Sequence, residues 1–143
     1  MNESKWALQL SQIVDEEHDS PFDEVERDAR NLIHKGKEKE LESRRFIVLD
    51  RLLYLAVARN QPDQDLERLF DEIQTCKDVR CYDLCNVYIR IARAMWDRCA
   101  WSRARDVVAS GIELFERMGT EESGKEQEEL EMLADEFTAS RSE

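Results

Sequence analysis

The residues best suited to chemistry in this chain are four cysteines, at positions 76, 81, 85 and 99. Three of them lie within ten positions, a density that could suit a zinc ion. Their spacings are four and three intervening residues, however, and tight zinc knuckles favour pairs of cysteines two residues apart. Small apolar packing is the favoured role and a structural metal the minor alternative. We therefore predict no metal site and reduced thiols.

The two histidines give no better case for catalysis. A nucleophilic site needs a base beside a thiol or hydroxyl. His18 lies in the acidic stretch 15–19, and His34 falls at the expected end of a helix. Carboxylate pairs arise by chance among 33 acidic residues, and no glycine-rich phosphate loop is present. The sequence therefore predicts no catalytic residue, no cofactor and no enzymatic activity.

Composition restricts the fold and the partners. The chain has 143 residues, 41% of them apolar, with only 4 Gly and 2 Pro, which is too few turn residues for an all-β fold. Its net charge of −12 argues against a nucleic-acid binder, which needs a basic face. The longest apolar run, residues 52–58, is far shorter than the ~20 residues of a membrane helix. No signal peptide is visible at the N-terminus, so we expect an intracellular protein that does not enter a membrane.

Apolar side chains recur at helical spacing in seven segments. Helices are expected over residues 3–17, from 20 to 35, over 41–57, around 66–73, over 80–97, from 101 to 118, and from 123 onwards. Short connections pair the first six as antiparallel hairpins. The seventh has an apolar stripe on an acidic background, which is typical of a cap over the end of a helical stack.

Four positions are expected to start or stop helices. Ser20 is suited to capping free amides, and Pro21 to the first helical position. Gly36 and Gly119 are suited to the left-handed stop that ends a helix. Residues 123–126 read Ser-Gly-Lys-Glu, which has the form of a capping box for the last helix.

Two segments repeat the same spacing of four and three residues. Leu66, Phe70 and Ile73 correspond to Ala104, Val108 and Gly111. The final hairpin resembles a tetratricopeptide (TPR) unit in its large and small residues, at Tyr88, Ile91, Ala92, Met95, Trp101, Ala104 and Gly111. Glu116 stands where that family usually has proline. This resemblance implies an all-α, right-handed superhelical solenoid of three hairpins plus a C-terminal capping helix. It would occupy residues 1–138 as a single domain, with a frayed tail over 139–143.

A narrower resemblance rests on short stretches spread over about half of the chain. They are Leu53-Tyr54-Leu55-Ala56, Leu69-Phe70, Val87-Tyr88, Ala104-Arg105 and Gly111-Ile112-Glu113. They are similar to the N-terminal TPR domains of spindle-assembly-checkpoint kinases, namely the budding-uninhibited-by-benzimidazole family and its cousin the monopolar-spindle kinase. The resemblance implies a module, in the nucleus at the kinetochore or in the cytoplasm, that recruits a checkpoint protein to a kinetochore scaffold by binding a short peptide. The alternatives are a general TPR adaptor or assembly-complex subunit, and a regulator that forms homo-oligomers.

The predicted partner site lies on the fifth helix. Residues 77–105 hold seven basic and three acidic residues, which favours an acidic or phosphorylated peptide unless the arginines pair with neighbouring acids. The groove face of a TPR hairpin maps to one stripe of this helix, and an amphipathic segment could also bind there. The candidate binding residues are Asn86, Ile89, Arg90, Arg93 and Trp96. Exposed Trp and Arg are common binding anchors. The alternative is that Trp96 packs beneath the third or the seventh helix as core.

Overall fold

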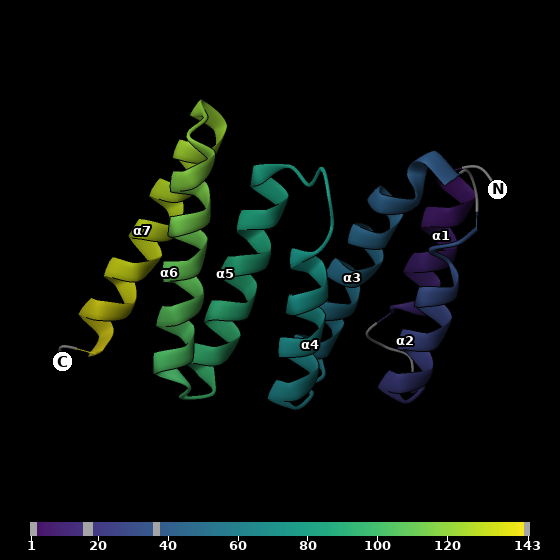
Figure 1. Cartoon of the computed structure of the whole chain (residues 1–143). Helices are drawn as coiled ribbons and strands as arrows, with labels where there is room; N and C mark the ends of the chain where they lie inside the picture. The colour runs from purple at the N-terminus through teal and green to yellow at the C-terminus, as the bar shows by residue number, and fades with distance from the viewer. Residues whose placement is uncertain (1–2, 16–18, 36–37, 142–143) are drawn as a thin grey trace. The chain divides into compact units, whose positions relative to one another are not determined.

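The chain is built from helices (Figure 1). The computed structural model describes residues 3–15, 19–35 and 38–141, and within these ranges it contains no strand. The elements are α1 (Glu3–Ile13), α2 (Phe22–Asn31), the short 3-10 helix η1 (Glu38–Glu40), α3 (Leu41–Ala58), α4 (Asp63–Gln74), α5 (Cys81–Asp97), α6 (Trp101–Met118) and α7 (Glu121–Arg141). The predicted all-α class is confirmed.

In the part of the chain that the structure describes, every helix is either too short or too polar to serve as a membrane span.

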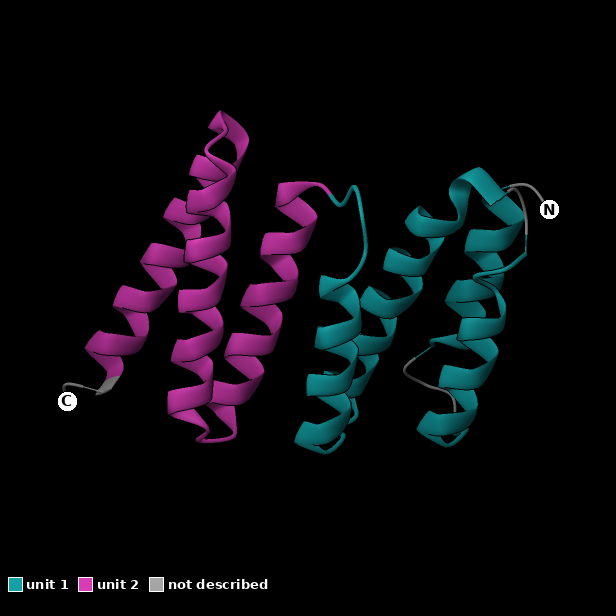
Figure 2. Ribbon diagram, viewed as in Figure 1, with its two compact units in different colours: residues 1–79 teal, residues 80–143 magenta. Residues whose placement is uncertain are grey.

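The helices cluster into two compact units (Figure 2). Unit 1 comprises residues 1–79 and unit 2 comprises residues 80–143. The single domain expected over 1–138 and the frayed tail expected over 139–143 stay predictions, and α7 continues through Arg141. The last two residues of that tail lie outside the described ranges.

In unit 1, α3 contacts both α2 and α4, and α1 contacts α2. The apolar pattern of α3 covers much of its circumference, so it can pack on two sides at once. Its fully buried side chains are Val48, Leu49, Leu52, Leu53, Leu55 and Ala56. The predicted stripe of α4, formed by Leu66, Leu69, Phe70 and Ile73, is buried as well.

The two ends of α2 differ from the sequence-based expectation. The helix begins at Phe22, and the carbonyl of Pro21 accepts the first backbone hydrogen bonds, so Ser20 is too far away to cap it. After the other end, two buried side chains donate to backbone carbonyls just beyond the helix: Trp6 Nε1 to Leu32 at 2.8 Å and Arg44 Nε to Ile33 at 3.1 Å. The expected stop at Gly36 lies outside the described residues.

A network of ion pairs joins α2 to α4. Arg30 of α2 donates two hydrogen bonds to Glu72 of α4, at 2.7 and 2.8 Å, and a third to Glu26 at 2.8 Å. Arg68 of α4 donates to both carboxylate oxygens of Glu26, one of them at 2.9 Å. Two-pronged guanidinium–carboxylate contacts fix orientation as well as distance. The network therefore sets the register between these two helices.

The arginines lower the pKa of both carboxyls. For Glu72 the largest influence is the hydrogen bond from Arg30, which lowers its pKa below the ordinary value of 4.5. For Glu26 the largest influence is burial, which opposes ionisation, but the hydrogen bonds from Arg68 and Arg30 outweigh it and lower the pKa overall. A carboxyl whose pKa is lower in the folded state than in the unfolded state stabilises the protein at any pH above its unfolded-state pKa. This stabilisation is lost as the pH falls through the folded-state pKa.

We expect Glu72→Gln to lower the free energy of unfolding by about 1–2 kcal/mol at pH 7, because it leaves Arg30 with half of its charged partners. The difference from the parent chain should shrink as the pH falls below the unfolded-state value of 4.5, and it should vanish once the pH passes through the lowered folded-state pKa of Glu72. Urea denaturation at a series of pH values measures both effects. Asp71→Asn, a similar change at the exposed neighbouring position, is the control. An equal loss in both variants would contradict the role given to the network.

In unit 2, α5 and α6 form a hairpin and α7 packs against both. Both neighbouring helices come close to Gly111 of α6. A Cβ atom there would lie 2.6 Å from Leu130 Cδ1 of α7 and 3.0 Å from Tyr88 Cδ1 of α5. Both of those side chains are buried. A larger residue at this point would therefore require Leu130 or Tyr88 to shift.

The turn before α7 combines one confirmed feature and one correction. Gly119 ends α6 in the left-handed conformation, with φ of 64°, as predicted. The capping box lies three residues earlier than expected. The Thr120 amide donates to Ser123 Oγ, and the Ser123 amide donates to Thr120 Oγ1, both at 3.0 Å. Thr120 is thus the capping residue, and Ser123 takes the reciprocal place that glutamate usually holds.

We expect Gly111→Ala to destabilise the chain by about 1–3 kcal/mol, because the new methyl group must displace packed side chains of two other helices. Gly124→Ala is the matched control, since nothing lies within 4 Å of its Cβ position and alanine is the better helix former. Thermal denaturation followed by circular dichroism compares the two. A Gly111→Ala chain as stable as the Gly124→Ala chain would show that the close approach is not limiting.

Candidate functional site

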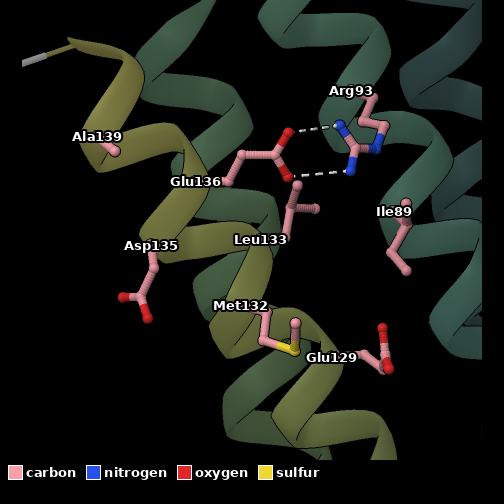
Figure 3. Close-up of a pocket in the computed structure, with 8 residues that line it drawn as sticks. All are labelled: Ile89, Arg93, Glu129, Met132, Leu133, Asp135, Glu136 and Ala139. Atoms are coloured by element: carbon pink, nitrogen blue, oxygen red, sulfur yellow. Dashed lines mark hydrogen bonds and ion pairs between the residues drawn. The ribbon is translucent and has the colours of Figure 1, made fainter. Parts of the chain in front are cut away.

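A groove between α5 and α7 is the candidate site in unit 2 (Figure 3). It has a volume of about 510 Å³ and is lined by Ile89 and Arg93 from α5 and by Glu129, Met132, Leu133, Asp135, Glu136 and Ala139 from α7. On α7, Leu130 lies near Gly111 of α6 and Phe137 stacks on Trp96 of α5, and both side chains are buried.

The lining of the groove is apolar in the middle and charged at its rim. Leu133 is buried and Ile89 is half-buried, whereas Met132 is 66% exposed. Arg93 reaches across from α5 and holds Glu136 of α7 by two hydrogen bonds, at 3.1 and 3.3 Å (Figure 3). An exposed ion pair of this kind contributes little stability. It marks one end of the groove.

Trp96 of α5 packs against α7. Its ring stacks on Phe137, with 4.3 Å between ring centroids and an interplanar angle of 1°. The ring centroid of Trp101 lies 6.3 Å from that of Trp96, and the two ring planes are tilted relative to each other. The Arg105 guanidinium lies 5.7 Å from the Trp96 ring centroid. In the structure Trp96 packs against the seventh helix, which is the alternative given by the sequence, and its side chain is half-buried.

The structure brings together two of the five candidate binding residues. Ile89 and Arg93 line the groove, while Trp96 packs beside it. Asn86 and Arg90 are half-buried and do not line it. The arginine of the stripe that reaches the groove, Arg93, is paired with an acid of the same unit, which is the alternative that the sequence left open.

Sequence reasoning missed the contribution of α7. Of its predicted stripe, Leu130, Leu133 and Phe137 are buried, whereas Ala134 is half-buried. The residues flanking that stripe, however, supply most of the groove lining. The usable indication was that Met132 interrupts an acidic helix surface with a large apolar side chain. The pattern alone does not say which neighbouring helix this side chain faces.

The cysteines show no sign of nucleophilic activation. Burial is the main cause that raises the pKa of Cys85 to about 12, assisted by a hydrogen bond from its thiol to the carbonyl of Glu126 at 3.7 Å. Burial also raises the pKa of Cys76 and of Cys81. Thiols with raised pKa values are poor nucleophiles. Cys99 is exposed, and all four are free thiols.

No metal centre emerges from the described ranges. Within them, no three His, Cys, Asp or Glu side chains gather in a way that could hold a metal ion. His34 is exposed near the end of α2, and His18 lies outside the described residues.

Comparisons with protein-family models, with curated proteins and with solved structures each find no match to this chain.

We expect Trp96→Ala to lower the free energy of unfolding by about 2–3 kcal/mol, because it removes the half-buried ring that carries Phe137. Arg93→Ala removes only an exposed ion pair and should cost about 1 kcal/mol or less. Comparing the two single variants by urea denaturation separates packing from groove chemistry. A Trp96→Ala chain with unchanged stability would return Trp96 to the set of candidate binding residues.

Proposed function

We propose that this chain is a protein-interaction module, without enzymatic activity, that binds a short peptide segment in the groove between α5 and α7. The observation that carries the proposal is the exposed side chain of Met132 beside Ile89 and Leu133 in a hollow of the surface. Apolar side chains grouped in a concave site are typical of places where ligands and partners bind. The flexible thioether of methionine also adapts to varied partner surfaces.

The TPR resemblance supports the same proposal at the level of architecture. The small residues that it requires, Ala92, Ala104 and Gly111, are fully buried or in close contact between helices. A TPR-like solenoid of three hairpins with a capping helix is therefore the architecture that we propose. The narrower resemblance to checkpoint kinases makes recruitment to a kinetochore scaffold the specific role proposed, with the nucleus or cytoplasm as its location.

The test uses peptides tiled across kinetochore scaffold proteins, with binding measured by isothermal titration calorimetry. We expect at least one peptide to bind, and Met132→Gln to weaken it about tenfold, because an apolar contact worth about 1.4 kcal/mol is lost. Leu8→Gln is the matched control, since Leu8 is also an exposed apolar residue on a helix, 60% exposed against 66% for Met132.

Two results would contradict the proposal. If no tiled peptide gives heat at high concentration, the checkpoint role is wrong. If a peptide binds but Met132→Gln and Leu8→Gln weaken it equally, the groove is not the site. Sedimentation of the chain alone shows whether the apolar surface is instead used by a second copy of the protein.

A further inference from the structure

We infer that the segment bound in this groove is a basic amphipathic helix, with apolar side chains against Ile89 and Met132 and a lysine or arginine facing Glu129. The inference rests on the proposed function and specifies its partner. It follows from the charges that line the groove and from what already neutralises them.

The groove carries an excess of negative charge. Its lining holds three carboxylates, Glu129, Asp135 and Glu136, against the single cation Arg93. Arg93 is already paired with Glu136 by two hydrogen bonds. Among the described residues, neither Glu129 nor Asp135 forms an ion pair. A partner must therefore bring positive charge if it is to match these two carboxylates.

The positions of the charges favour a helical occupant. Glu129 and Glu136 are seven residues apart on α7, so they lie on one face about 10 Å apart, with Met132 and Leu133 between them. In Figure 3 the Glu129 carboxylate reaches out on the side of Ile89, whereas Asp135 points away from α5. A partner helix packed along α7 can match this pattern, with a cation about one turn from an apolar side chain.

An acidic or phosphorylated peptide fits the groove less well. It would have to displace Glu136 from Arg93 and would then face Glu136, Glu129 and Asp135 together. Like charges brought together at an interface reduce affinity. The sequence favours either an acidic peptide or an amphipathic segment as the partner. The charges of the groove favour the amphipathic segment and require that it be positively charged.

The test uses two synthetic amphipathic helical peptides of equal length, each with a leucine stripe, whose remaining positions are lysine in one and glutamate in the other. Fluorescence anisotropy measures their dissociation constants for the full chain. We expect the lysine peptide to bind and the glutamate peptide not to bind. Glu129→Gln should weaken the lysine peptide about five- to tenfold. Glu128→Gln, the same change at an exposed α7 position that does not line the groove, should leave the dissociation constant within about twofold.

Each other outcome overturns the inference. Equal weakening by Glu129→Gln and Glu128→Gln would mean that the peptide responds only to the overall charge of −12. Tighter binding of the glutamate peptide, or no binding of either peptide, would also exclude a basic occupant. The proposed function fails separately, because it depends on Met132→Gln: if that variant still weakens a scaffold peptide, the groove remains a binding site whose partner is not basic.

Discussion

The absence of a side chain at Gly111 is the constraint on which unit 2 depends. Because Tyr88 and Leu130 occupy the space that a Cβ atom would take, α6 lies close to α5 and to α7 at the same point. That contact lies near the middle of α7. The Trp96–Phe137 stack lies nearer the end of that helix. The groove is the space that remains between these two contacts, so its shape follows from packing that is remote from its own lining.

Different interactions hold the helices together in the two units. Unit 1 combines an apolar core around α3 with a charged network on α2 and α4, in which Arg30 contacts two carboxylates. Unit 2 relies on close steric fit and stacked rings. Charged networks respond to pH and salt, whereas packed apolar contacts respond mainly to changes in volume. The two halves of the chain should therefore be sensitive to different conditions.

The sequence predicted the helices well because their burial follows from local spacing. The apolar stripes of α2, α4, α5 and α7 are buried at nearly every expected position. Apolar residues spaced three or four apart lie on the same face of a helix, and that face packs against the core. Helix ends were less predictable. The start of α7 depends on a reciprocal bond between Thr120 and Ser123, a pairing that differs from the usual threonine–glutamate form.

The candidate site could be predicted only on the α5 side. The stripe pattern placed Ile89 and Arg93 on one surface of α5, but it could not show that Glu136 of α7, 43 residues away from Arg93, would pair with the arginine. Nor could it decide whether Trp96 is covered, because that depends on where Phe137 arrives in three dimensions. Partners that are distant in the chain are set by tertiary packing, which local periodicity does not encode.

The distribution of tryptophan gives the protein an intrinsic optical probe in each unit. Trp6 is almost wholly buried in unit 1 and is hydrogen-bonded through its indole nitrogen. Trp96 and Trp101 lie together in unit 2, beside Phe137 and close to the positive charge of Arg105. Indole emission depends on the polarity and charge around the ring. The three fluorophores therefore report on separate environments, and movement of the last helix away from the hairpin would alter the emission of the pair while leaving that of Trp6 unchanged.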